Sequence, residues 1–139
     1  MPANTQFSIA IHVMAALACG CDKDLTSGDL ALSVNTSPSF VRRVLAKLSR
    51  AGLVETATGK AGRTWLARDP KRISLLDIYR AVDAPAAFAI HDYAEQKACP
   101  VSCHIKAALD KALGKTQKAM EASLEESTLA QVVSEVRKK

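Results

Sequence analysis

Residues 37–52 read Ser-Pro-Ser-Phe-Val-Arg-Arg-Val-Leu-Ala-Lys-Leu-Ser-Arg-Ala-Gly and predict one helix with two opposite faces. Four apolar residues recur at helical spacing and predict a buried face: Val41, Val44, Leu45 and Leu48. Three cations repeat the same spacing roughly 200° away around the helix: Arg43, Lys47 and Arg50. Ser37 as N-cap, Pro38 in the first turn and Gly52 beyond the last turn bound the helix.

The positive charge of the chain is concentrated in its first half. Residues 1–72 hold ten Lys and Arg against five Asp and Glu, whereas residues 73–139 hold nine of each. No acidic residue lies between Asp29 and Glu55, the stretch that contains the basic helix. A solvated surface helix is one explanation, but a basic half beside a neutral half favours a polyanion partner. We expect nucleic acid and no membrane partner, because neither an exposed apolar face nor a lipidation signal is evident.

The flanking segments predict a winged helix-turn-helix. An amphipathic helix over residues 5–18 is followed by Thr-Ser-Gly-Asp at 26–29, a capping box that starts a short helix. A tight turn then leads into the basic helix, which completes the helix-turn-helix pattern. Two strands, 53–56 and 64–68, enclose a Gly-containing turn and predict a wing with Lys60 and Arg63 near its tip.

The second half of the chain predicts a long helix. Another capping box at Ser74 begins a short helix. The secondary structure of residues 84–97 is ambiguous. Cys99 then precedes a helix of up to about 28 residues, or ~42 Å. Its stripe consists of Ile105, Leu109, Ala112, Thr116, Met120 and Leu124. We expect this stripe to be buried in a homodimer, the alternative being that the helix folds back on the N-terminal domain. A short helix restarts at Thr128.

These patterns predict a mainly α chain. Residues 1–72 form a winged helix-turn-helix DNA-binding domain, and residues 73–139 form a helical dimerisation and candidate sensing region. No apolar run reaches the ~20 residues of a membrane span, and we expect a cytoplasmic protein. No catalytic motif is present, so we expect no enzyme. His12 falls in the apolar region of the first helix, where we expect a core histidine.

In order and spacing, the motifs resemble those of the IscR/NsrR-like bacterial regulators, the Rrf2 or "Rrf-two" family. The matching residues are Ser39-Phe40-Val41, Arg50-Ala51-Gly52-Leu53-Val54, Leu66-Ala67-Arg68, Ile73-Ser74-Leu75-Leu76-Asp77-Ile78 and Ala81-Val82-Asp83. The tail resembles the YwnA-like branch that lacks a cluster, through Cys99-Pro100-Val101, Gln117, Ala119-Met120-Glu121, Leu124 and Thr128-Leu129. The resemblance implies a homodimer on a palindromic operator of double-stranded DNA, with the long helices crossing at the dimer interface. It also implies that Ser39, Arg42 and Arg43 contact base edges.

The sequence departs from the family pattern in the wing. Family members carry an Arg before the first Gly of the wing and a Gly-Gly-Tyr near its end. Here the corresponding positions hold Thr58 and Gly62-Arg63-Thr64. Lys60 or Arg63 would therefore have to replace the usual minor-groove arginine.

Four cysteines occur as two close pairs, Cys19 with Cys21 and Cys99 with Cys103. Cluster-binding family members present three cysteines before the long helix, whereas this sequence offers two. His91 and His104 could add imidazole ligands, but neighbouring helical residues point ~100° apart, so Cys103 and His104 cannot easily share an ion. We therefore expect no metal and no iron–sulfur cofactor.

Cys99 lies where a helix N-terminus would stabilise a thiolate, with Cys103 one turn later. This arrangement suggests a candidate redox sensor, although a buried, inert cysteine is the alternative. The role of Cys19 and Cys21 stays unassigned.

The sequence predicts a homodimeric DNA-binding transcriptional regulator, a repressor that responds to a redox or small-molecule signal. The alternative is a winged-helix adaptor that binds proteins and has lost specific DNA binding, as the altered wing suggests. The candidate DNA-binding residues are Ser39, Arg42, Arg43, Lys47, Arg50, Lys60 and Arg63.

Overall fold

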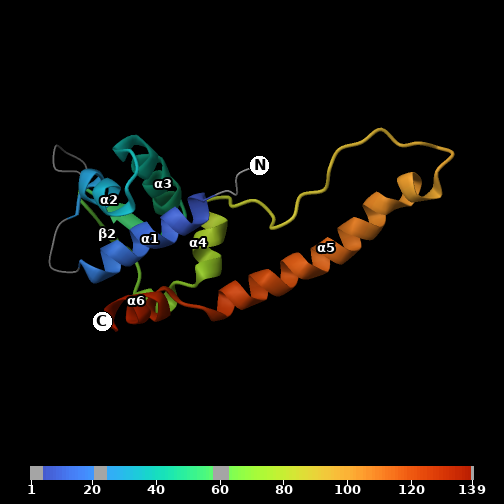
Figure 1. The fold of residues 1–139 in the computed structure, drawn as a ribbon. Coiled ribbons are helices and arrows are strands. Elements are labelled where there is room, and N and C mark those ends of the chain that lie inside the picture. Colours follow the sequence, from blue (N-terminus) through green and yellow to red (C-terminus); the bar gives the residue numbers. More distant parts are fainter. Residues whose placement is uncertain (1–4, 21–24, 58–62, 139) are drawn as a thin grey trace. The chain divides into compact units, whose positions relative to one another are not determined.

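The computed structural model describes residues 5–20, 25–57 and 63–138 (Figure 1). Its elements are α1 (Gln6–Cys19), α2 (Ser27–Val34), α3 (Pro38–Arg50), β1 (Val54–Thr56), β2 (Thr64–Leu66), the short 3-10 helix η1 (Pro70–Arg72), α4 (Leu75–Ala81), α5 (Pro100–Glu126) and α6 (Leu129–Arg137). The expected mainly α fold, with a two-stranded wing and a long C-terminal helix, is confirmed.

The chain packs as two compact units. One comprises Met1–Ala84 together with Leu124–Lys139, and the other comprises Pro85–Ser123. Packing therefore joins α4, the end of α5 and α6 to the helix-turn-helix, whereas the sequence suggested a boundary after residue 72. The division of roles at that boundary, with DNA binding before it and dimerisation after it, stays a prediction.

Helix α1 is the centre of the first unit. It contacts α2, α3, α4, α6 and β2, and its core residues are Ala10, Val13, Met14, Ala15 and Leu17. A helix surrounded on most sides must be apolar around most of its circumference, and the sequence of α1 meets that requirement. At its N-terminal end, the ring of Phe7 packs edge-on against Tyr79 of α4, with ring centroids 5.2 Å apart.

The position of His12 in α1 differs from the expectation. Its side chain is exposed, and Nε2 lies 3.0 Å from the hydroxyl of Ser33 in α2. The prediction of a core histidine was therefore wrong. The imidazole instead joins α1 to α2 at the surface, where a polar ring keeps its contact with water.

Helix α2 begins with the predicted capping box. The hydroxyl of Thr26 accepts the backbone N–H of Asp29 at 3.2 Å, and the Asp29 carboxylate accepts the backbone N–H of Thr26 at 3.0 Å. This backbone hydrogen bond, followed by one from the Thr26 hydroxyl, holds the pKa of Asp29 below its usual value. The ionised box therefore stabilises α2 fully above the ordinary pKa of an aspartate, and this contribution is lost as the pH falls through the lowered pKa.

The wing is an antiparallel pair in which Val54 faces Leu66 and Thr56 faces Thr64. Leu25 extends this sheet, because its carbonyl accepts the backbone N–H of Thr64 at 3.1 Å. At the middle pair of β1 and β2, Trp65 donates its indole N–H to the carboxylate of the facing Glu55 at 2.9 Å. The wing tip and Lys60 lie outside the described residues.

The C-terminal segment returns to the first unit through backbone hydrogen bonds. Leu75 donates its N–H to the carbonyl of Ser127, and Leu129 donates to the carbonyl of Ile73, both at 2.8 Å. Thr128 then caps α6, as predicted, by accepting the backbone N–H of Gln131. The side chain of Leu129 is fully buried in the core that α1 organises. Helix α6 is therefore an integral part of this unit.

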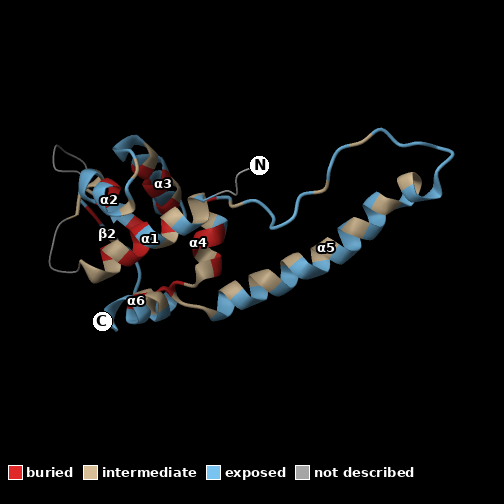
Figure 2. Ribbon diagram, in the orientation of Figure 1, coloured by how far each residue is buried: buried red, intermediate tan, exposed pale blue. Residues whose placement is uncertain are grey.

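The second unit consists of the irregular segment 85–99 and residues 100–123 of α5. Every residue of α5 is described, and none is buried (Figure 2). Ile105, Leu109, Met120 and Leu124 of the expected stripe are half-buried within the chain, and Ala112 and Thr116 are exposed. Burial of this stripe in a dimer stays a prediction. Leu113, which the prediction omitted, is half-buried and continues the stripe.

The packing of α6 predicts how the domain responds to truncation of Leu129. Leu129→Ala should lower the free energy of unfolding by about 2–5 kcal/mol, because it leaves a cavity in the core. The matched change Val136→Ala, at an exposed position of the same helix, should have an effect within about 0.5 kcal/mol. Urea denaturation followed by circular dichroism measures both, and equal small effects would show that α6 does not belong to this core.

Candidate nucleic-acid interface

The buried face of α3 determines which side chains the helix presents to solvent. All four predicted core residues, Val41, Val44, Leu45 and Leu48, are buried. The Ser37 hydroxyl caps the start of the helix by accepting the backbone N–H of Phe40 at 3.2 Å. At the other end Gly52 has φ of +77°, a left-handed conformation that favours glycine and lets the chain turn into β1. Rotation of α3 about its axis is thus fixed.

The polar face of α3 carries the predicted binding residues. Ser39, Arg42, Arg43 and Arg50 are exposed, and Lys47 is half-buried. The structure thus places five of the seven predicted DNA-binding residues on one helix. Arg63 is exposed just before β2, and Lys60 lies outside the described residues.

Contacts within the first turns of α3 orient two of the arginines. Arg42 donates from Nη2 to the hydroxyl of Ser39 at 3.4 Å, a separation at the long end of hydrogen-bond distance. The guanidinium carbon of Arg43 lies 5.4 Å from the centroid of the Phe40 ring, within cation–π range. Sequence analysis missed this role of Phe40, although its position three residues before Arg43 is the spacing at which helical side chains meet.

A hollow of about 690 Å³ separates α3 from the wing. Its lining includes Arg42, Ser49 and Arg50 of α3, Thr56 of β1 and Thr64 of β2. Guanidinium and hydroxyl groups are hydrogen-bond donors of the kind that contact phosphate oxygens. The hollow thus combines polar groups that can contact phosphate with the apolar side chains of Leu45 and Ala46.

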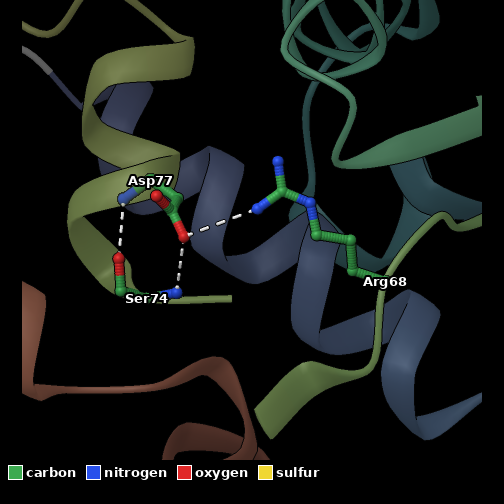
Figure 3. Close-up of polar contacts among 3 residues, drawn as sticks. All are labelled: Arg68, Ser74 and Asp77. Atoms are coloured by element: carbon green, nitrogen blue, oxygen red, sulfur yellow. Dashed lines mark hydrogen bonds and ion pairs between the residues drawn. The ribbon is translucent and has the colours of Figure 1, made fainter. Parts of the chain in front are cut away.

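Another cation of the first unit, Arg68, is occupied in a structural contact. Its Nη1 lies 3.9 Å from a carboxylate oxygen of Asp77, as Figure 3 shows. The same oxygen accepts the backbone N–H of Ser74 at 3.0 Å, and the Ser74 hydroxyl accepts the N–H of Asp77, which closes the predicted capping box. Arg68 therefore connects the end of the wing to the start of α4. Its positive charge is partly neutralised, which distinguishes it from the arginines on α3.

The candidate sensing residues lie in the other unit. Cys99 is exposed and Cys103 is half-buried, both at the start of α5. Cys19 is half-buried at the end of α1, and Cys21 lies outside the described residues. The structure thus keeps Cys19 in a different unit from Cys99 and Cys103.

The sequence model of the Rrf2 family, described as "Iron-dependent Transcriptional regulator", matches residues 3–135. The chain belongs to the Rrf2 family. This result confirms the resemblance to IscR/NsrR-like regulators that the sequence motifs indicated. DNA-binding regulation of transcription is the function that the family and its named members support.

Individual relatives agree with this assignment. YwnA of Bacillus subtilis (strain 168), whose name describes an HTH-type transcriptional regulator, is 36% identical over 132 residues, or 94% of this chain and 96% of YwnA. A solved structure of a candidate DNA-binding protein is 33% identical in sequence and superimposes with a TM-score of 0.71. The match covers 91% of this chain and 97% of the other chain. The structure of IscR from T. potens has the same fold, with a TM-score of 0.70 and 22% sequence identity. The match covers 99% of this chain and 89% of the IscR chain.

The family description mentions iron, which proteins bind through the side chains of residues such as Cys, His, Asp and Glu. Within residues 5–20, 25–57 and 63–138, no three His, Cys, Asp or Glu side chains come together in a way that could hold an ion. A cluster or structural metal ion generally takes about four protein ligands. The described residues of one chain therefore do not bring such a ligand set together. None of the described helices is both long and apolar enough to span a membrane.

Proposed function

We propose that this Rrf2-family protein is a homodimeric repressor that binds a palindromic operator with one α3 helix from each protomer. The observation that carries the proposal is the division of α3 into a fully buried apolar face and an exposed face rich in Arg. Helices with these features enter the major groove, where their N-terminal residues reach base edges and flanking cations reach phosphates.

The exposed residues of α3 suggest a division of roles along the helix. Ser39, Arg42 and Arg43 lie in the first half, and an arginine can bind the two acceptors of guanine in the major groove. Arg42 contacts Ser39, and Arg43 contacts Phe40. These contacts reduce the side-chain conformational entropy that the arginines would lose on binding. Lys47 and Arg50 follow along the helix and are assigned to phosphates, as is Arg63 before β2.

The proposed dimer is supported by the exposure of α5. A helix of 27 residues is about 40 Å long, yet none of its residues is buried within the chain. Its half-buried apolar residues nevertheless follow one stripe: Ile105, Leu109, Leu113, Met120 and Leu124. A second copy of the same stripe is an apolar surface that could cover it, as symmetry-related helices do in many homodimers.

Binding selection from a randomised DNA duplex library, followed by titration at several salt concentrations, tests the DNA contacts. Arg42→Ala and Arg43→Ala should each reduce the preference for the selected site over random duplex roughly 5- to 150-fold, equivalent to about 1–3 kcal/mol. Lys47→Ala should instead weaken binding to all duplexes and reduce the salt slope by about 1. Lys111→Ala, an equal charge loss on α5, is the control and should change neither quantity.

Two outcomes would contradict this assignment. An unchanged site preference in both arginine variants would show that α3 does not read the bases. A wild-type chain that selects no duplex would favour the winged-helix adaptor. For a selected site, in vitro transcription from a template that carries it tests repression, and undiminished transcript at saturating protein would contradict it.

Sedimentation of Leu109→Asp tests the proposed dimer. The wild-type chain should sediment as a dimer, whereas an uncompensated carboxylate in the apolar stripe should give monomers with weakened operator binding. Ile105→Asp should behave in the same way. Ala122→Asp adds the same charge on the opposite side of α5 and should remain dimeric. A monomeric wild-type protein, or a dimeric Leu109→Asp variant, would contradict a dimer through this stripe.

A further inference from the structure

Cys99 acts as the cap of α5. Its carbonyl accepts the backbone N–H of Cys103 at 3.1 Å, the first hydrogen bond of the helix. Its sulfur lies 3.4 Å from the backbone nitrogen of Ser102 and accepts that N–H. Serine, threonine, asparagine and aspartate are the usual residues for this role, so a thiol here is chemically unusual and, being exposed, is accessible to reagents.

Cys103, one turn further on, holds the preceding segment against the helix. Its thiol lies 3.6 Å from the carbonyl oxygen of Gln96 and 3.7 Å from that of Lys97, either of which it can donate to. The carbonyl of Gln96 also accepts the backbone N–H of Cys99 at 2.9 Å. Both thiols therefore stabilise the corner at which segment 85–99 turns into α5.

Few other interactions secure this corner. Tyr93 donates its hydroxyl to the carbonyl of Ser102 at 2.6 Å, and the Ser102 hydroxyl accepts the N–H of Gln96 at 2.8 Å. No residue from 85 to 126 is buried. Structure held by exposed hydrogen bonds without a core opens locally at low free-energy cost. A hollow of about 350 Å³, lined by Cys103 together with Tyr93 and Lys106, gives small molecules access to the second sulfur.

We propose that Cys99 and Cys103 form a redox switch, in which a small-molecule disulfide converts the two thiols into an intramolecular disulfide and opens the first turn of α5. The Cys99 thiolate attacks one sulfur of the small disulfide and expels one thiolate, which leaves a mixed disulfide on Cys99. The Cys103 thiolate then attacks the Cys99 sulfur and expels the second small thiol. The two cysteines lose two electrons and two protons, and the small disulfide gains both.

Helix geometry explains why the bridge would open the turn. Cys99 directly precedes α5 and Cys103 lies in its first turn. At helical spacing, side chains four residues apart have Cβ atoms about 5–6 Å apart, whereas a disulfide requires about 3.5–4.5 Å. Closure therefore requires the backbone around Cys99 to move, and the Ser102 N–H loses the sulfur that caps it. Cys103 at the same time gives up its contacts with Gln96 and Lys97. Under the proposed function, this change at the start of the dimer helix lowers DNA affinity.

The test uses the full chain with Cys19→Ser and Cys21→Ser, which leaves only the two proposed cysteines. After incubation with oxidised glutathione, intact mass should show the loss of two hydrogens and no retained glutathione, and non-reducing electrophoresis should show no cross-linked dimer. Amide hydrogen exchange at Ser102 and Cys103 should accelerate at least several-fold. Adding Cys103→Ser should leave glutathione attached to Cys99.

Retained glutathione on both cysteines, a bridge between protomers, or unchanged amide exchange in the bridged protein would overturn the proposal. Operator titration of the bridged protein should show affinity at least several-fold lower than the reduced protein, with recovery on reduction. Unchanged affinity in the bridged form would refute the switch. If the reduced protein itself binds no operator, the proposed function fails, while the mass and exchange measurements still decide whether the bridge forms.

Discussion

The burial of one face of α3 against the rest of the N-terminal unit is the constraint on which the candidate interface depends. Val41, Val44 and Leu48 have no exposed surface, so turning the helix about its axis would bring apolar side chains into water. The same constraint directs Arg42 and Arg43 outward. Since α1 packs against α3, α2 and β2, it also fixes the positions of the turn and the wing relative to this cationic face.

The hydrogen bonds between residues 73–75 and 127–129 have a second consequence. They anchor the end of α5 and all of α6 in the unit that carries α3, so the proposed dimer helix ends in the unit that holds the candidate interface. Arg68 adds a contact from the wing to α4, but both partners are more than two-fifths exposed, and such pairs contribute about 0–1 kcal/mol. The backbone connections and the buried Leu129 therefore dominate this junction.

Local signals predicted much of the fold. The cap residues Thr26, Ser37, Ser74 and Thr128 all start helices, because capping depends on side chains within three residues. Nonlocal packing was less accessible. His12 was wrongly placed in the core because α1 is apolar around most of its surface. In such a helix the pattern of apolar residues does not distinguish the buried face from the exposed one. The return of α6 to α1 depends on contacts more than 100 residues apart, which no local pattern encodes. In the candidate site the exposed arginines were predicted, but the Arg68–Asp77 contact was not.

The central claim is that the exposed face of α3 binds double-stranded DNA. The most direct measurement is NMR of isotopically labelled protein titrated with the selected duplex. The account predicts that signals of Ser39, Arg42, Arg43 and Lys47 shift in proportion to bound duplex, while buried Val133 in α6 shifts little. Saturation of the protein with duplex while these α3 signals remain unperturbed would contradict the account.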